Sequence, residues 1–184
     1  MSPDAVRWRY RGTAHCFGDD LEHDAHMIPF EFVIRRVTEP AELLPHLFEA
    51  VRPGLAARMK AGDVLVAGQR FGKGKAHIQA YIALKAIGVA IVCESLPYNT
   101  YRALVGLGLP FMSGCEGVTG RVADGEEIEV DFGTGEFINH SRGTRHAYPP
   151  LPPQARDIIE LGGTEGVLRD WWARARAAEH GGRG

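Results

Sequence analysis

Short apolar runs alternate with helical patterns through the first two thirds of the chain. The runs at residues 64–67 and 89–93 are short, rich in β-branched residues and flanked by glycine, as buried strands are. Between them, Ala80, Leu84 and Ile87 follow a helical spacing. A strand, helix, strand unit nearly always forms a parallel pair with a right-handed crossover, so this region predicts a parallel α/β layer.

The neighbouring segments extend this layer on both sides. A helix at 98–107 followed by a strand at 109–112 repeats the unit, and an alternating run at 6–16 predicts a strand before it. Helical spacing with prolines near the starts predicts two short helices at 39–51 and 53–60.

The pattern changes after Gly117. Short runs at 119–123, 127–132 and 137–139 are separated by glycine-containing turns, which predicts small antiparallel strands. Two helices are expected at the end of the chain, at 154–161 and 165–178. We expect one domain over residues 1–184, with an α/β fold, a parallel sheet core and an appended small antiparallel β element.

Composition and charge narrow the class of protein. The 21 Lys and Arg against 23 Asp and Glu give a net charge of -2, so no overall positive field attracts nucleic acid or an acidic membrane. The longest apolar runs are too short to span a bilayer, and the N-terminus lacks the pattern of a secretion signal. We expect a cytoplasmic protein that binds neither nucleic acid nor membrane.

The cysteines and the polar turn at 18–24 bear on metal binding. Cys16, Cys93 and Cys115 are far apart and form no C-x-x-C pair, so we expect buried thiols and no metal or cofactor bound by this chain. His23-x-x-His26 could ligate a divalent ion, but the alternative is a solvated acidic turn, and we predict no metal site.

A glycine-rich cationic segment follows the strand predicted at 64–67. Gly72 and Gly74 let the backbone approach a ligand closely, and Arg70, Lys73 and Lys75 supply positive charge. A helix start after the loop would add unpaired N–H groups and the positive end of the helix dipole. The segment therefore predicts a site for a carboxylate or phosphate; a plain strand-to-helix turn is the alternative.

Two nucleotide motifs do not fit this segment. From Gly68 the spacing to Gly74-Lys75 is one residue too long for a Walker loop, and Ala76 supplies no hydroxyl for magnesium. A dinucleotide fingerprint would require glycine or alanine at His77. ATP and NAD are therefore disfavoured as ligands.

Several short sequence motifs occur in the same order as in one enzyme family. Residues 18–29 read GDDLEHDAHMIP, residues 62–74 read GDVLVAGQRFGKG, residues 83–89 read ALKAIGV, and residues 158–163 read IIELGG. They resemble the acidic opening G-D-N-I-D-T-D-x-I-I-P, the loop G-D-I-I-V-A-G-x-N-F-G-C-G and the closing helices of the small subunit of isopropylmalate dehydratase and homoaconitase. This subunit is equivalent to the swivelling domain of aconitase.

The resemblance implies a fold, a partner and an activity. It implies the three-layer β/β/α swivel fold and a hydro-lyase small subunit of amino-acid biosynthesis. It also implies an aconitase-type large subunit that carries a [4Fe-4S] cluster, and a small hydroxy-carboxylic acid such as an isopropylmalate as substrate. Two alternatives stay open: a module that binds an anionic metabolite without chemistry, and a regulatory subunit that has lost catalysis.

The chain departs from the family pattern directly after the glycine loop. The family continues S-S-R-E-H-A, in which the first serine is the catalytic base and the arginine binds a substrate carboxylate. Here these two positions are Lys75 and His77, and the position of the loop cysteine is Lys73. Neither role can simply be transferred, so the catalytic residues have diverged.

Lys75 and His77 are the candidate catalytic residues. Lys75 could act as the base if desolvation, the positive charge of Lys73 and Arg70 and the helix start all favoured loss of its proton. The alternative is a protonated Lys75 that holds a carboxylate or phosphate. His77 could be a base that needs less tuning, or only a polar residue of the first helical turn.

The candidate substrate-binding residues lie in three segments. Asp24 is in the acidic turn. Arg35 and Arg36 end the stretch at 30–36, which resembles the segment that selects the substrate side chain in relatives, and they could reach a distal carboxylate or phosphate. A surface basic pair is the alternative for the two arginines. The remaining candidates are the loop residues Arg70, Gly72, Lys73 and Gly74.

Overall fold

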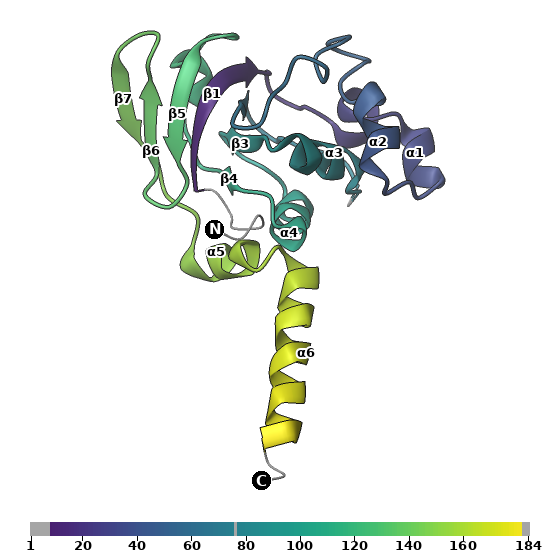
Figure 1. The fold of residues 1–184 in the computed structure, drawn as a ribbon. Helices are drawn as coiled ribbons and strands as arrows, with labels where there is room; N and C mark the ends of the chain where they lie inside the picture. The colour runs from purple at the N-terminus through teal and green to yellow at the C-terminus, as the bar shows by residue number, and fades with distance from the viewer. Residues whose placement is uncertain (1–7, 76, 182–184) are drawn as a thin grey trace.

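A mixed sheet of seven strands organises the computed structural model, which describes residues 8–75 and 77–181 and the side chains as far as Ala177 (Figure 1). The strand order is β4-β3-β2-β1-β5-β6-β7. Strands β1 to β4 pair in parallel, and β5, β6 and β7 continue from β1 in antiparallel pairing. The strands are β1 Arg9–Cys16, β2 Val64–Ala67, β3 Ala90–Cys93, β4 Phe111–Met112, β5 Glu127–Asp131, β6 Glu136–Asn139 and β7 Thr144–Ala147.

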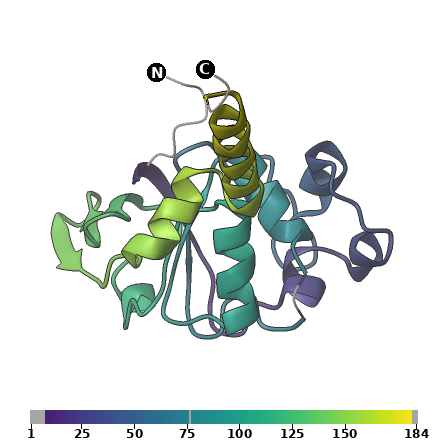
Figure 2. The same cartoon turned by 90° about the horizontal axis from the view of Figure 1, so that it is seen from below.

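The helices lie before, between and after these strands. They are the π-helical turn η1 His23–Met27, α1 Phe30–Ile34, α2 Pro40–Leu43, the 3-10 turn η2 Leu44–His46, α3 Gln79–Ile87, α4 Tyr98–Leu107, the 3-10 turn η3 Val118–Gly120, α5 Pro153–Glu160 and α6 Thr164–Gly181. Helix α6 projects from the body, and the view from below shows α4 and α5 beside its base (Figures 1 and 2). Among the described residues, no helix combines the length and the apolar character needed to cross a membrane.

Alternation along the central strands separates two apolar cores. Leu65 and Ile91 point to the face covered by helices, where they pack with residues of α3, α4 and α5. Their neighbours Val66 and Val92 point to the opposite face, because successive side chains of a strand alternate. Residues of β5 and β6, such as Val130 and Phe137, close that second core. The result is a helical layer, a parallel layer and an antiparallel layer, which confirms the expected three-layer α/β fold.

Glycines end the two crossover helices. The C-caps of α3 and α4 are Gly88 and Gly108, both in the left-handed region with φ of 85° and 71°. Their N–H groups donate to carbonyls of the last helical turn, which satisfies groups that a helix end leaves unpaired. The chain is thereby returned to the sheet directly, and the prediction of a helix at 98–107 is confirmed by α4.

The sequence predictions differ from the structure in several places. The helix expected at 39–51 is limited to the short α2 and the 3-10 turn η2, and residues 47–51 form turns. Residues 53–60 form turns instead of a helix, with Gly54 at φ 70° interrupting a helical path. Residues 119–123 form the end of η3 and a turn, so no strand is present there. Strand β7 was not predicted, because Thr144–Ala147 is largely exposed and lacks an apolar alternation.

Candidate active site

Two loops that are far apart in the sequence run side by side at the carboxyl end of β2. The N–H of Gly72 donates to the Leu21 carbonyl at 2.8 Å, and the N–H of His23 donates to the Lys73 carbonyl at 3.2 Å. Glu22 and Lys73 form an isolated parallel bridge. These backbone bonds hold the acidic turn at 18–24 against the glycine loop at 68–74.

Gly72 is required by its surroundings. Its φ is 72°, and a Cβ at this position would clash with the Tyr81 hydroxyl and lie 2.8 Å from Oγ1 of Thr100. The Gly72 carbonyl accepts a hydrogen bond from that Oγ1 at 2.9 Å. Gly74 differs, because a Cβ there would meet nothing within 4 Å, although its φ of 125° also favours glycine. The loop is therefore packed at Gly72 and open at Gly74.

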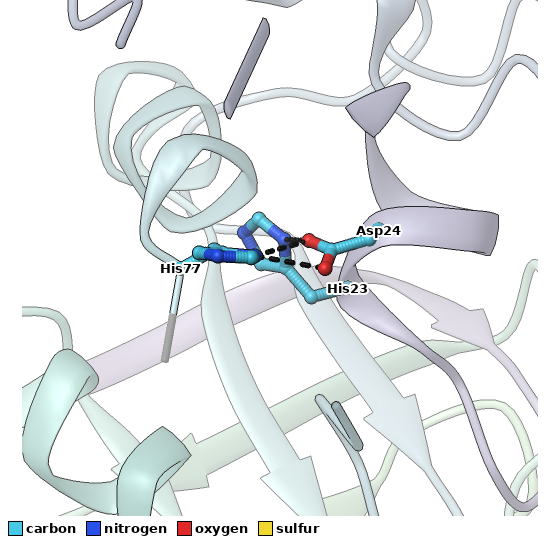
Figure 3. A group of neighbouring side chains, drawn as sticks. All are labelled: His23, Asp24 and His77. Carbon is cyan, nitrogen blue, oxygen red and sulfur yellow. Dashed lines mark hydrogen bonds and ion pairs between the residues drawn. The ribbon is translucent and has the colours of Figure 1, made fainter. Parts of the chain in front are cut away.

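His23, Asp24 and His77 converge beside this loop, as Figure 3 shows. Nδ1 of His23 lies 2.7 Å from Oδ1 of Asp24, and Nδ1 of His77 lies 2.8 Å from each Asp24 carboxylate oxygen. His23 comes from η1 and His77 from the segment just before α3. The side chains of Asp24 and His77 are 25% and 21% exposed, so the cluster reaches the surface.

His23 is the buried member of the cluster, with no exposed area. Its Nε2 accepts a hydrogen bond from the N–H of Ala80, in the first turn of α3, at 3.2 Å. Its ring packs edge-on against Tyr81, with the centroids 5.1 Å apart. Burial lowers the pKa of His23 below its ordinary value and raises the pKa of Tyr81 to about 12. Both side chains are therefore held in their neutral forms.

The cations Arg70 and Lys73 face the acidic turn. Arg70 binds Asp20 through two hydrogen bonds of 2.7 and 2.6 Å, and Nζ of Lys73 lies 3.4 Å from both Asp20 and Glu22. The hydrogen bonds from Arg70 lower the pKa of Asp20 to about 2. Much of the positive charge that the sequence places in the loop is thus paired within this chain.

Lys75 lies apart from these contacts. Its side chain is exposed, and it has no ion pair or hydrogen bond from its ammonium to any residue that the structure describes. Helix α3 begins at Gln79, so the helix start is closer to His77 than to Lys75. Of the three features that a base role for Lys75 would need, burial is missing and the neighbouring cations are paired with acids. A free cation at the loop surface suits an anion better.

Arg35 and Arg36 end the short helix α1 and are both exposed. Arg35 lies 3.5 Å from Glu42 and stacks on the Phe32 ring. The beginning of α1 is nearer the cluster, because the Phe30 ring lies 5.7 Å from that of His77. Within the described residues, no contact joins either arginine to the cluster.

The cluster has the residue types of a metal site, since its three potential ligand atoms lie within 4.8 Å of one another. Its hydrogen bonds favour a different reading. Nε2 of His23 accepts a hydrogen bond from the N–H of Ala80, so the ring proton of neutral His23 is on Nδ1, where it faces Asp24. His26 is turned away, and its Nδ1 accepts the N–H of Glu22 at 3.0 Å. The geometry therefore fits a hydrogen-bonded relay.

The cysteines do not fit an iron-sulfur cluster. Cys93 and Cys115 are buried and Cys16 is half-buried, and burial raises the pKa of Cys16 to about 11 and that of Cys115 to about 12. Among the described residues, the three metal-binding side chains that lie together are His23, Asp24 and His77, and no cysteine belongs to such a group. The thiols behave as inert packing groups.

Sequence reasoning found Asp24 and His77 but missed the part of His23. It weighed His23 only as a metal ligand with His26, whereas the structure joins it to Asp24 and to α3. Asn99 and Thr100 were also missed as supports of the loop, where Nδ2 of Asn99 donates to the Gly74 carbonyl at 2.8 Å. The adjacent pair His23-Asp24 was the available signal, but its link to His77 spans 53 residues.

Comparisons with individual known proteins agree on one family. No model of a protein family matches the chain. The 3-isopropylmalate dehydratase small subunit of Moorella thermoacetica is 36% identical over 154 residues, which are 83% of this chain and 90% of that protein. Small subunit 1 of the same enzyme from Methanopyrus kandleri is 37% identical over 166 residues, covering 90% of this chain and 95% of that protein.

A solved structure extends the likeness to the fold. The crystal structure of 3-isopropylmalate dehydratase (leuD) from Methanocaldococcus jannaschii matches with a TM-score of 0.82 and 29% identity, covering 92% of this chain and 99% of that one. The order of segments seen in the sequence and the three-layer architecture agree with this match. The chain therefore belongs to the family of 3-isopropylmalate dehydratase small subunits.

Proposed function

We propose that this chain is the small subunit of a hydro-lyase that removes water from, or isomerises, a hydroxy-carboxylic acid of the isopropylmalate type. The observation that carries the proposal is the Asp24–His77 pair, held at 2.8 Å beside an open glycine loop in a member of this family. A carboxylate-oriented imidazole at a surface that binds anions is suited to proton transfer next to a carboxylate.

The site on this chain is incomplete for such a reaction. A proton on a carbon next to a carboxylate is weakly acidic, so the reaction needs a base and electrophilic stabilisation of the developing charge. We assign that stabilisation to a [4Fe-4S] cluster on an aconitase-type large subunit, where it would act as a Lewis acid, because the cysteines of this chain form no cluster ligand set. The partly exposed cluster of His23, Asp24 and His77 would face that subunit.

The loop supplies the anion-binding part of the half-site. We assign a substrate carboxylate to the ammonium of Lys75 and to the open backbone at Gly74. Arg70 and Lys73, paired with Asp20 and Glu22, keep the loop in place and contribute a weaker field. A role for Arg35 and Arg36 at a distal carboxylate stays a prediction.

The wider setting of the chain follows from the same proposal. As a small subunit of this kind it would act in the cytoplasm in amino-acid biosynthesis, with the large subunit and a small anionic acid as partners. Neither nucleic acid nor a membrane is needed for that role.

The proposal is tested by anaerobic co-expression with an aconitase-type large subunit from the same organism. We expect the two chains to co-purify and to dehydrate at least one malate or citrate homologue, seen as the ultraviolet absorbance of the unsaturated product. The M. thermoacetica small subunit with its own large subunit is the assay control.

Two outcomes would contradict the proposal. A complex that forms but turns over no hydroxy acid would favour the non-catalytic alternatives. If the chains do not associate under conditions in which the control pair does, this chain is not a hydro-lyase subunit of that type.

A further inference from the structure

His23 sets the protonation of the whole cluster. Its Nε2 accepts a hydrogen bond from the N–H of Ala80. This donor is a backbone group of α3, so it is present whatever the side chain at position 80. The ring is completely buried, so its neutral form carries its proton on Nδ1. The Nδ1–H group donates a hydrogen bond to Oδ1 of Asp24. The start of α3 therefore fixes both the tautomer of His23 and the direction of its hydrogen bond.

Asp24 receives hydrogen bonds from two histidines. An ionised carboxylate only accepts hydrogen bonds, so Nδ1 of His77 must also carry a proton where it meets the two Asp24 oxygens. This leaves Nε2 of neutral His77 with a lone pair. Nε2 has no hydrogen-bond partner among the described residues, and the side chain is 21% exposed. The lone pair is thus available at the surface that the large subunit would cover.

From this geometry we propose that Nε2 of His77 accepts the substrate's proton, and that Asp24 and His23 position His77 and do not bind substrate. This inference rests on the proposed function. It gives the base role to His77, which leaves Lys75 to hold a carboxylate. It also replaces substrate binding by positioning as the role of Asp24.

The proton transfer balances without an oxidant or reductant. The C–H bond next to the carboxylate breaks, and its proton moves to Nε2 of His77. The electron pair of that bond forms the C=C bond. The C–O bond breaks, its electron pair leaves with the hydroxyl oxygen, and a proton from an acid group or water on the partner's side converts the leaving hydroxide to water. The imidazolium of His77 then releases its proton to solvent, from which the proton donor is restored, so no net proton is gained or lost.

The sharpest test is His77→Arg in the reconstituted complex, because it replaces the histidine by the residue that the family pattern has at this position. If His77 transfers the proton, kcat falls by about 10²–10⁴-fold, the usual contribution of a general base, while KM changes little. If His77 instead holds a carboxylate as a cation, His77→Arg keeps or improves turnover, and the inference is wrong.

Four further variants, which are Asp24→Asn, Lys75→Ala, His77→Gln and the control His140→Gln, separate the roles of base, positioning residue and anion binder. Asp24→Asn should lower kcat by about a hundredfold with little change in KM, since the orienting carboxylate is lost. Lys75→Ala should mainly raise KM. His140→Gln, on the distant β6–β7 hairpin, should leave both constants unchanged. Loss of kcat in Lys75→Ala with retention in His77→Gln would return the base role to Lys75 and overturn the inference.

A measurement on the isolated full-length chain separates this inference from the proposed function. Nitrogen-15 NMR of the histidine rings distinguishes which ring nitrogen carries the proton. We expect the Nδ1–H tautomer for His77 in the wild type and its loss in Asp24→Asn. An Nε2–H tautomer in the wild type would contradict the inference even if the complex is active. An inactive complex with the Nδ1–H tautomer would instead count against the proposed function.

Discussion

The residue that ties the site to the fold is His23. Its ring is completely buried. Its Nε2 accepts a hydrogen bond from the N–H of Ala80, and its Nδ1–H donates one to Asp24. Burying a neutral imidazole costs little folding free energy when both nitrogens are hydrogen-bonded, whereas burying the charged imidazolium would cost much more. The cluster is therefore sensitive to acid through His23.

The stability of the chain should fall on mild acidification because of this residue. Burial lowers the pKa of folded His23 below its ordinary 6.5. Below about pH 6.5, His23 is therefore protonated to a greater extent in the unfolded chain than in the folded chain. The contribution of His23 to the unfolding free energy is full above pH 6.5. It is lost at up to about 1.4 kcal/mol per pH unit below that value.

Urea unfolding at pH 7.5 and pH 5.5 measures this effect. We expect a smaller difference between the two pH values in His23→Gln than in the wild type. Ile91→Val is the control, because it removes buried apolar contact without a titrating group and should destabilise equally at both pH values. An unchanged pH dependence in His23→Gln would show that folded His23 takes up a proton freely.

At the scale of elements, the glycine loop is held from two sides. The acidic turn bonds to its backbone, and the first turn of α4 supplies Asn99 and Thr100 to the carbonyls of Gly74 and Gly72. The acidic turn and α4 therefore fix the backbone of the loop, while the side chain of Lys75 stays exposed.

Gly72 and Gly54 offer a matched pair that tests this packing. Both have a positive φ, of 72° and 70°, but a Cβ at Gly54 would meet nothing within 4 Å, whereas one at Gly72 would clash with Tyr81 and Thr100. Gly54→Ala should cost about 1–2 kcal/mol of unfolding free energy for the left-handed backbone. Gly72→Ala should cost about 1–3 kcal/mol more, because the clash adds to that strain.

Urea unfolding of the two variants checks the difference. Equal losses in Gly54→Ala and Gly72→Ala would mean that Tyr81 and Thr100 do not pack against the loop as described.

Local sequence patterns predicted the central elements because their signals are local. The runs that form β2 and β3 are short, apolar and flanked by glycine, and the segment of α4 has helical spacing, so each signal lies within the segment itself. The helix expected at 53–60 did not form because Gly54 adopts a left-handed backbone, which apolar spacing does not reveal. Strand β7 is held by pairing with β6 and buries little of its own, so it left no pattern.

The sequence allowed individual candidate residues of the site to be named, but not their contacts in space. Asp24 and His77 were named from their positions in the acidic turn and the loop. Their contact depends on two segments 53 residues apart that meet only in the fold. The pairing of Arg70 with Asp20 is equally non-local, and it removes much of the free charge that the loop sequence suggests.

At the scale of the whole molecule, the three layers place the partly exposed cluster of His23, Asp24 and His77 and the exposed Lys75 beyond the carboxyl end of β2. In the proposed function, the chain supplies the proton acceptor and the anion site, and the large subunit supplies the electrophile. A hydro-lyase reaction therefore requires a second polypeptide, as the relatives' designation as small subunits implies. We propose that this chain completes an active site on that partner.

The most direct test is an anaerobic titration of a fixed amount of the large subunit with this chain, followed by the rate of hydroxy-acid dehydration. We predict no turnover without this chain and a rate that rises and saturates as the chain is added. When His77→Arg is added instead, we expect saturation at a rate about 10²–10⁴-fold lower. The result that would show this chain not to complete the site is no turnover at any amount of it, while the M. thermoacetica small subunit activates its own large subunit in the same assay.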